Sequence, residues 1–128
     1  MTTSVTPLRG SGPGSAADLF KRLWDELVAL ISTPATAALM RRALKRAVPR
    51  IPELQGVAVN REGLEYAFVL PAHWRDPARA DAVQALRRLV REELEPLFRE
   101  LTGPVVSRHL ARVAELVEAG LAGEEDAG

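Results

Sequence analysis

The sequence predicts an α+β fold of the order α-α-β-β-α-α, in which a helical layer packs against one antiparallel β-hairpin. Three observations predict it. Apolar residues recur at helical spacing through residues 16–48 and again through residues 77–119. Between these stretches, residues 54–70 read as two short strands joined by a turn. The chain has 128 residues and is 47% hydrophobic, which is enough for one domain with its own core.

The composition predicts three parts of the chain. We expect residues 1–15 to be a flexible N-terminal segment, because they are rich in Thr, Ser, Gly and Pro. Residues 16–120 form a single α+β domain. Residues 121–128 form an acidic, disordered tail, because glycine, alanine and acidic residues dominate the end of the chain.

Two helices are expected before the hairpin. The first covers residues 16–31, whose leucines form an apolar stripe at helical spacing. The second covers residues 34–48. Ser32 or Thr33 is suited to cap it, and Pro34 is suited to its first position, where the missing N–H costs nothing.

The hairpin is expected to turn through a three-residue loop, Arg61 to Gly63, with Asn60 opposite Leu64. This register gathers large apolar residues on one face, which would cover the helices. That face contains Leu64, Tyr66, Phe68 and Leu70. The other face is mixed and would stay uncovered, so it is the candidate surface for self-association. The residues of this face that would make the contact are Val57, Val59, Ala67 and Val69.

Two more helices are expected after the hairpin. The third begins at Pro77, is capped by Asp76, and keeps its apolar phase beyond Pro96. A proline inside a helix either kinks it or splits it. We expect a kink, because the apolar spacing survives the proline. The last helix runs from Pro104 to Gly120.

Composition excludes several classes of site and sets the expected location. The chain has no Cys, so it has no disulfides, thiolate nucleophiles or Cys-ligated metals. No apolar run is long enough for a transmembrane span, and the N-terminus lacks the apolar region of a secretory signal. We therefore expect a cytoplasmic protein that does not bind membranes. Arginine outnumbers lysine 15 to 2, which suggests a bacterium with a GC-rich genome.

The titratable residues do not predict an enzyme. His73 and His109 are the only histidines, and neither lies in a metal-binding motif. The glutamates fall on the polar sides of helices, where solvent keeps carboxylates ordinary. We expect no catalytic residues, no metal and no cofactor. His109 is expected to be a packed or partly buried imidazole, and Trp74 to anchor the loop that carries His73.

The second helix carries the most distinctive pattern, a run of basic residues without an acid. We call these five residues the basic face: Arg41, Arg42, Lys45, Arg46 and Arg50. They are either a solvated surface or a docking surface for an acidic protein or for nucleic acid. The chain is basic near this helix and acidic at its end, so it can also pair its own halves or associate head to tail with copies of itself.

A DNA-binding alternative follows from the same residues. A helix pair followed by a hairpin is similar to a winged helix, with residues 34–48 as the recognition helix and the hairpin as the wing. Three features oppose this alternative. Only two helices precede the hairpin, the net charge is zero, and the basic face has no Asn, Gln or Ser to read base edges.

The function that we expect is a non-enzymatic protein-interaction or accessory domain of a bacterium, self-associating as a homodimer or binding another protein. The DNA-binding regulator is the alternative. A second alternative is a small-ligand-binding domain, because five aromatic or imidazole side chains could line a pocket. Those residues are Trp24, Tyr66, Phe68, His73 and Trp74.

Overall fold

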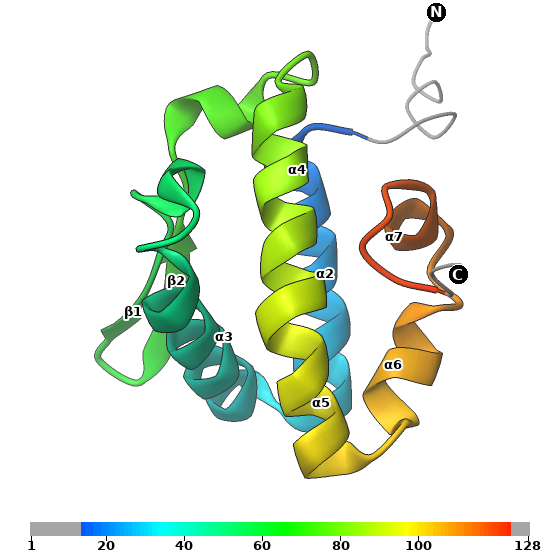
Figure 1. The fold of residues 1–128 in the computed structure, drawn as a ribbon. Helices are drawn as coiled ribbons and strands as arrows, with labels where there is room; N and C mark the ends of the chain where they lie inside the picture. The colour runs from blue at the N-terminus through cyan, green and yellow to red at the C-terminus, as the bar shows by residue number, and fades with distance from the viewer. Residues whose placement is uncertain (1–13, 124–128) are drawn as a thin grey trace, which may run out of the picture.

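The computed structural model describes residues 14–123, which are mainly helical with one two-stranded antiparallel sheet (Figure 1). In chain order the elements are α2 (Ala16–Ile31), α3 (Thr33–Ala47), the 3₁₀ helix η2 (Pro52–Leu54), β1 (Ala58–Glu62), β2 (Glu65–Val69), the 3₁₀ helix η3 (Ala72–Arg75), α4 (Ala80–Arg88), the π-helix η4 (Leu89–Leu94), α5 (Glu95–Thr102), α6 (Val105–Leu110) and α7 (Ala114–Glu118). This order confirms the α+β layout that the sequence predicts.

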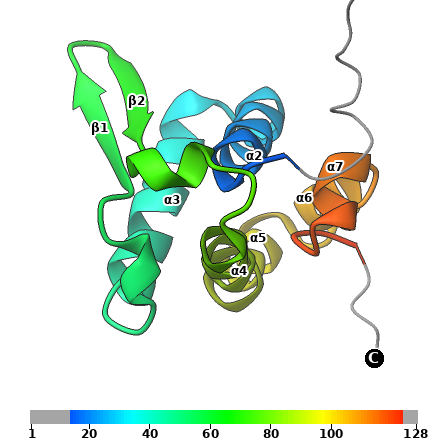
Figure 2. The same cartoon turned by 90° about the horizontal axis from the view of Figure 1, so that it is seen from above.

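Helix α2 lies at the centre of the fold. It contacts α3, α4, α6, α7 and η3. The rod formed by α4, η4 and α5 runs beside α2, and the hairpin and the last two helices lie on opposite sides of this pair (Figures 1 and 2). The side chains with no exposure, among them Phe20, Leu86 and Phe98, come from several of these elements. One continuous core therefore joins the helical layer to the hairpin.

The α2–α3 pair follows local sequence signals closely. Ser15 and Asp18 form a reciprocal capping box at the start of α2. Ser32 accepts a hydrogen bond from the N–H of Ala35, and Pro34 lies in the first turn of α3. Ser32 adopts φ 94°, so a single residue ends one helix and caps the next. The predicted bounds of the first helix are confirmed, and those of the second differ by one residue at each end.

The predicted hairpin register is wrong. Glu62 pairs with Glu65, so the turn has two residues and not three. Gly63 takes the first turn position with φ 66°, as a type II′ turn requires. Leu64, which was expected to face the core, is 90% exposed at the tip. Gly63 does supply the positive φ that was expected of it, but it opens the turn instead of closing a bulge.

The corrected register exchanges the two faces of β1. Ala58 moves from the position opposite Tyr66 to the position opposite Val69, and Val59 now pairs with Phe68. An odd shift turns every side chain of one strand to the other face. Val59 is therefore only 5% exposed, although it was expected on the outer face. Pairing Val59 with Phe68 buries two large apolar side chains together, which favours this register over the predicted one.

The third helix starts later than expected and does not split at Pro96. Asp76 accepts a hydrogen bond from the N–H of Ala78 in a turn, and the helix begins only at Ala80. Before Pro96 the chain widens into η4, where the N–H of Glu95 bonds to the carbonyl of Val90, five residues back. The wider turn relieves the clash between a proline ring and the carbonyl four residues earlier.

The last predicted helix is broken in two. Val113 is extended, with φ −93° and ψ 103°, and separates α6 from α7. The break turns the chain back so that both short helices contact α2. Leu121 and Ala122, which were assigned to the tail, are buried in the core. Residues 124–128 of the predicted tail and residues 1–13 lie outside the described residues.

No helix between residues 14 and 123 is both long and apolar enough to cross a membrane.

Candidate partner-binding site

All five residues of the basic face are exposed, but the structure divides them into two groups. Helix α3 itself has no acidic residue, so any anionic partner has to come from another element. Arg46 and Arg50 face η4 and find glutamates there. Arg41, Arg42 and Lys45 form no ion pair with any residue between 14 and 123. We call these three residues the outer cations.

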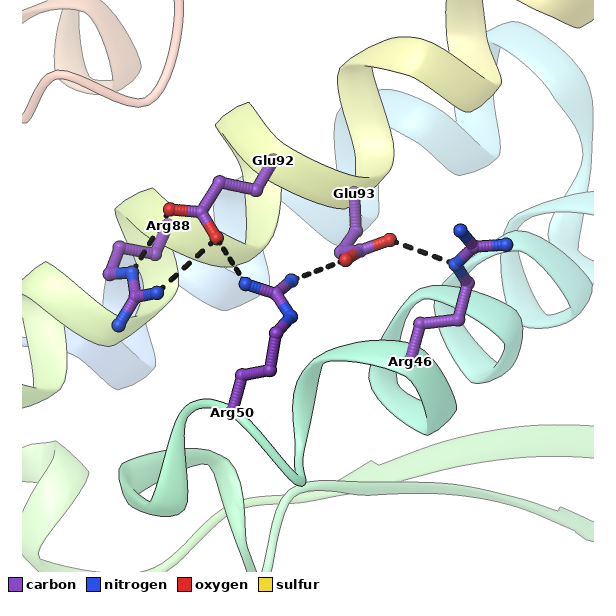
Figure 3. Close-up of polar contacts among 5 residues, drawn as sticks. All are labelled: Arg46, Arg50, Arg88, Glu92 and Glu93. Atoms are coloured by element: carbon purple, nitrogen blue, oxygen red, sulfur yellow. Dashed lines mark hydrogen bonds and ion pairs between the residues drawn. The ribbon is translucent and has the colours of Figure 1, made fainter.

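Arg46 and Arg50 belong to an alternating row of charges (Figure 3). The Arg50 guanidinium donates to Glu93 and, at 2.7 Å, to Glu92. Glu93 also pairs with Arg46 at 3.2 Å, and Glu92 accepts from Arg88 at 3.0 Å. Each cation in the row therefore has a carboxylate beside it, and the row joins α3 to the α4–η4 rod.

Hydrogen bonds within the row favour the ionised forms of Glu92 and Arg50. Hydrogen bonds from Arg88 and then Arg50 hold the pKa of the Glu92 carboxyl below its usual value. The hydrogen bond to Glu92 raises the pKa of the Arg50 guanidinium further above its already high value. Arg46 and Arg50 are thus neutralised within the molecule, and an external anion would have to displace a carboxylate to reach them.

The π-helix explains how two consecutive glutamates reach the same arginine. Glu92 and Glu93 both lie in η4, which packs against α3. A π turn holds more residues than an α turn, so neighbouring side chains diverge less around the axis. The sequence predicts that these glutamates lie on a solvated surface. Pro96 is the one feature of the sequence that points to a π turn here.

A shallow groove lies beside the outer cations, between α3 and β1. Its volume is about 390 Å³. It is lined by Arg41, Leu44, Lys45, Val48, Pro49, Val57, Ala58 and Val59. Leu44, Val57 and Val59 are 5–7% exposed and form an apolar floor, whereas Arg41 and Lys45 are exposed and form a cationic rim. We call this feature the α3–β1 groove.

The predicted self-association face does not exist as one surface. Val57 and Val59 turn inward and contribute to the core and to the floor of the α3–β1 groove. Ala67 and Val69 stay exposed on β2, with Val69 at 49%. The cause for Val59 is the shift in register, which places each side chain of β1 on the face opposite to the expected one.

The five residues of the predicted ligand pocket mostly serve the core. Phe68 packs against Trp24 at 5.4 Å between ring centroids and against Phe20 at 4.9 Å. Trp74 has no exposure, so it anchors its loop as expected. Tyr66 is half-buried beneath Arg61, whose guanidinium carbon lies 5.8 Å from the ring centroid. Aromatic side chains that fill the core in this way leave little of their surface for a ligand.

Both histidines pair with glutamates. His109 lies 2.7 Å from Glu26 and is partly buried, with 40% of its side chain exposed. His73, in η3 after the hairpin, contacts Glu53, in η2 before it. Within residues 14–123 no three His, Asp or Glu side chains gather closely enough to hold a metal ion.

A second hollow lies at the other end of the helical layer. Its volume is about 330 Å³, and it is lined by Ile31, Ala35, Ala38, Leu39, Phe98, Leu101, Thr102 and Val106. Leu101 is 63% exposed at its edge, and the nearby Val105 is 58% exposed. We call it the apolar hollow. The sequence placed most of these residues in the core and did not show that they surround an open space.

Comparisons with protein-family models, with curated proteins and with solved structures found no match to this chain.

Proposed function

We propose that this chain is a non-enzymatic protein-interaction or accessory domain that binds an acidic segment of a partner protein at the α3–β1 groove. The single observation that carries the proposal is the position of the outer cations. They form no ion pair within residues 14–123, while Arg46 and Arg50 do, and Arg41 and Lys45 line an apolar groove. The bacterial cytoplasm remains the expected setting and is part of the proposal.

The apolar floor and the cationic rim contribute differently to binding. Exposed ion pairs contribute about 0–1 kcal/mol each, so the rim selects and orients an acidic partner without supplying most of the affinity. Burial of apolar side chains on the floor, at roughly 25 cal/mol per Å², supplies the larger part. The floor residues Leu44, Val57 and Val59 are held by the core, so the groove is formed before the partner arrives.

Protein is a better partner for this surface than DNA. A DNA-binding wing would carry its hairpin tip against phosphates, but Glu62 and Glu65 form the closing pair of this hairpin and are both exposed. Two of the five cations that would meet phosphate are already neutralised. These two features of the structure weaken the DNA-binding hypothesis further.

The test is affinity capture from a lysate of the source cell, with and without nuclease. The wild type is compared with Arg41→Glu/Arg42→Glu/Lys45→Glu. The matched control, Arg99→Glu/Arg108→Glu/Arg112→Glu, makes the same charge change at exposed arginines on or next to α5 and α6. A protein that is retained by the wild type and the control but lost by the first variant supports the proposal. Equal capture by all three, or capture of nucleic acid alone, rejects it.

Self-association has a separate support in the apolar hollow. Leu101 is 63% exposed beside a wholly apolar depression, and such a side chain on one copy can enter the hollow of a second. This contact would be insensitive to salt, unlike binding at the outer cations. Light scattering after size exclusion should show a mass that rises above 13.9 kDa with concentration and returns to it in Leu101→Asp. A constant mass of 13.9 kDa at all concentrations excludes it.

A further inference from the structure

The lining of the α3–β1 groove shows that it follows the edge of a strand. Val57, Ala58 and Val59 are consecutive, and all three line it. Successive side chains of an extended chain point to opposite faces of a sheet. Val57 directly precedes β1, and Ala58 and Val59 are its first two residues, so a groove that touches all three runs along the edge of β1 where the strand begins and not over either face.

That edge has no neighbouring strand within the described part of the chain. The sheet consists of β1 and β2, so each strand has one side that faces no other strand. Between residues 14 and 123, the backbone of Ala58–Glu62 makes no hydrogen bond to any element except β2 and the turn. Alternate N–H and C=O groups of an edge strand are available to a new strand.

We propose that the acidic partner segment binds in an extended conformation and adds to the free edge of β1 as a third strand, between β1 and α3. This inference rests on the proposed function and names the form of the ligand: a peptide in which acidic and apolar residues alternate. Only an extended segment can pair with the backbone groups of an edge strand. The apolar side chains of the peptide pack on the apolar floor, and its acidic side chains reach the cations of the rim.

The spacing of the rim cations fits this ligand. Arg41 and Lys45 are four residues apart on α3, which is about 6 Å along the helix axis. Alternate residues of a strand are about 6.6 Å apart. Where the peptide runs along α3, two of its acidic residues at positions i and i+2 can therefore face Arg41 and Lys45 together. The long side chains of both cations absorb the small difference in spacing.

The experiment uses the full chain, labelled with ¹⁵N, and a blocked synthetic peptide of alternating glutamate and valine, about seven residues long. Saturable shifts of the amide signals of Val57–Arg61 are expected at low salt. A peptide of alternating lysine and valine should not shift them. In Arg41→Glu/Lys45→Glu the affinity for the glutamate peptide should fall at least about tenfold, whereas Arg108→Glu/Arg112→Glu should leave it unchanged.

Backbone pairing is tested separately with two N-methylated versions of the glutamate peptide. One carries methyl groups on the amides of its valines, and the other on those of its glutamates. Because alternate residues of a strand direct their N–H groups to opposite edges, strand addition requires one version to lose binding and the other to keep it. If both versions bind as well as the parent, the strand-addition proposal is wrong, while the proposed function still stands on the charge variants.

The remaining outcomes are also decisive. Absence of saturable shifts with the parent peptide, or equal shifts with the lysine peptide, overturns the inference. Shifts of the β1 amides that depend on protein concentration without peptide would show that a second copy occupies the edge, which also overturns it. The capture experiment with Arg41→Glu/Arg42→Glu/Lys45→Glu judges the proposed function independently of all these results.

Discussion

Two groups of basic side chains in this protein have the same chemistry and opposite roles. The outer cations lie on α3 and pair with no residue between 14 and 123. Arg87 and Arg91, on α4 and η4, donate hydrogen bonds to carbonyl oxygens of the segment 119–123, which follows α7. Arg87 donates to Ala119, and Arg91 donates to Gly120, Ala122 and Gly123. We call Arg87 and Arg91 the clamp arginines.

This difference shows that the tertiary partner, and not the residue type, decides whether an arginine stabilises the fold or stays available for binding. Both groups consist of basic side chains on helices. The clamp arginines hold a non-helical segment, whose carbonyls cannot bond within a helix, onto the α4–η4 rod. The outer cations have no such segment beside them. Arg46 and Arg50 are intermediate, because glutamates neutralise them at the surface.

The largest expected effect is that of removing a clamp arginine. Arg91→Ala should lower the free energy of unfolding by about 2 kcal/mol, because it leaves carbonyls of Gly120 and Ala122 without their charged donor. Urea denaturation measures it. Arg41→Ala is the control and should change stability by less than about 0.5 kcal/mol. Similar losses in the two variants would show that the comparison between the two groups is wrong.

A smaller effect is expected at the intermediate arginines, Arg46 and Arg50. Glu93→Gln should lower the free energy of unfolding by about 1 kcal/mol, because the Glu93 side chain is only 12% exposed and pairs with both Arg46 and Arg50. It should also make those arginines available and raise the affinity for the glutamate–valine peptide about threefold. Glu100→Gln, at an exposed position on α5, is the control for both measurements. Unchanged peptide affinity would contradict the view that pairing with Glu93 keeps Arg46 and Arg50 from binding the peptide.

Salt should separate the two groups further. The Debye length falls from about 30 Å at 0.01 M salt to about 10 Å at 0.1 M, so binding at the exposed outer cations should weaken over this range. The loss of stability in Arg91→Ala should change little, because its hydrogen bonds are direct and the side chain is 17% exposed. Titrations of peptide and urea at the two salt concentrations measure both. A salt-independent peptide affinity would remove the role of the outer cations.

The smallest effect concerns a third, local use of an arginine. Hydrogen bonds from Arg79 lower the pKa of the Asp81 carboxyl from 3.8 to about 2. The ionised form is therefore favoured in the folded state. Its contribution to stability is complete above about pH 4 and is lost as the pH falls toward 2. The stability difference between the wild type and Asp81→Asn should be constant at neutral pH and vanish near pH 2. A difference that persists at pH 2 would have another cause.

The first half of the fold could be predicted because its signals are local. Ser15 with Asp18, and Ser32 with Pro34, lie within a few residues of the helix ends that they define. The hairpin could be located but its register could not. Gly63 fits either a two-residue or a three-residue loop, and the choice was made by burying Val59 beside Phe68.

The candidate site was only partly predictable for the same reason. All five residues of the basic face could be named, and pairing between the two halves of the chain was anticipated. Which cations would be neutralised depended on the π turn at Glu92 and Glu93, 42 and 43 residues away from Arg50. The α3–β1 groove could not be foreseen, because it exists only where Leu44 and Val59 come together.

The sequence by itself determined the order of the elements, the caps of α2 and α3, and the absence of cysteine chemistry. Each of these depends on residue type or on neighbours within one helical turn. The tertiary structure decided the strand register, the break between α6 and α7, the burial of Leu121, and the division of the basic face. A charge is written in the sequence, but the distance to its partner is set only when elements many residues apart pack together.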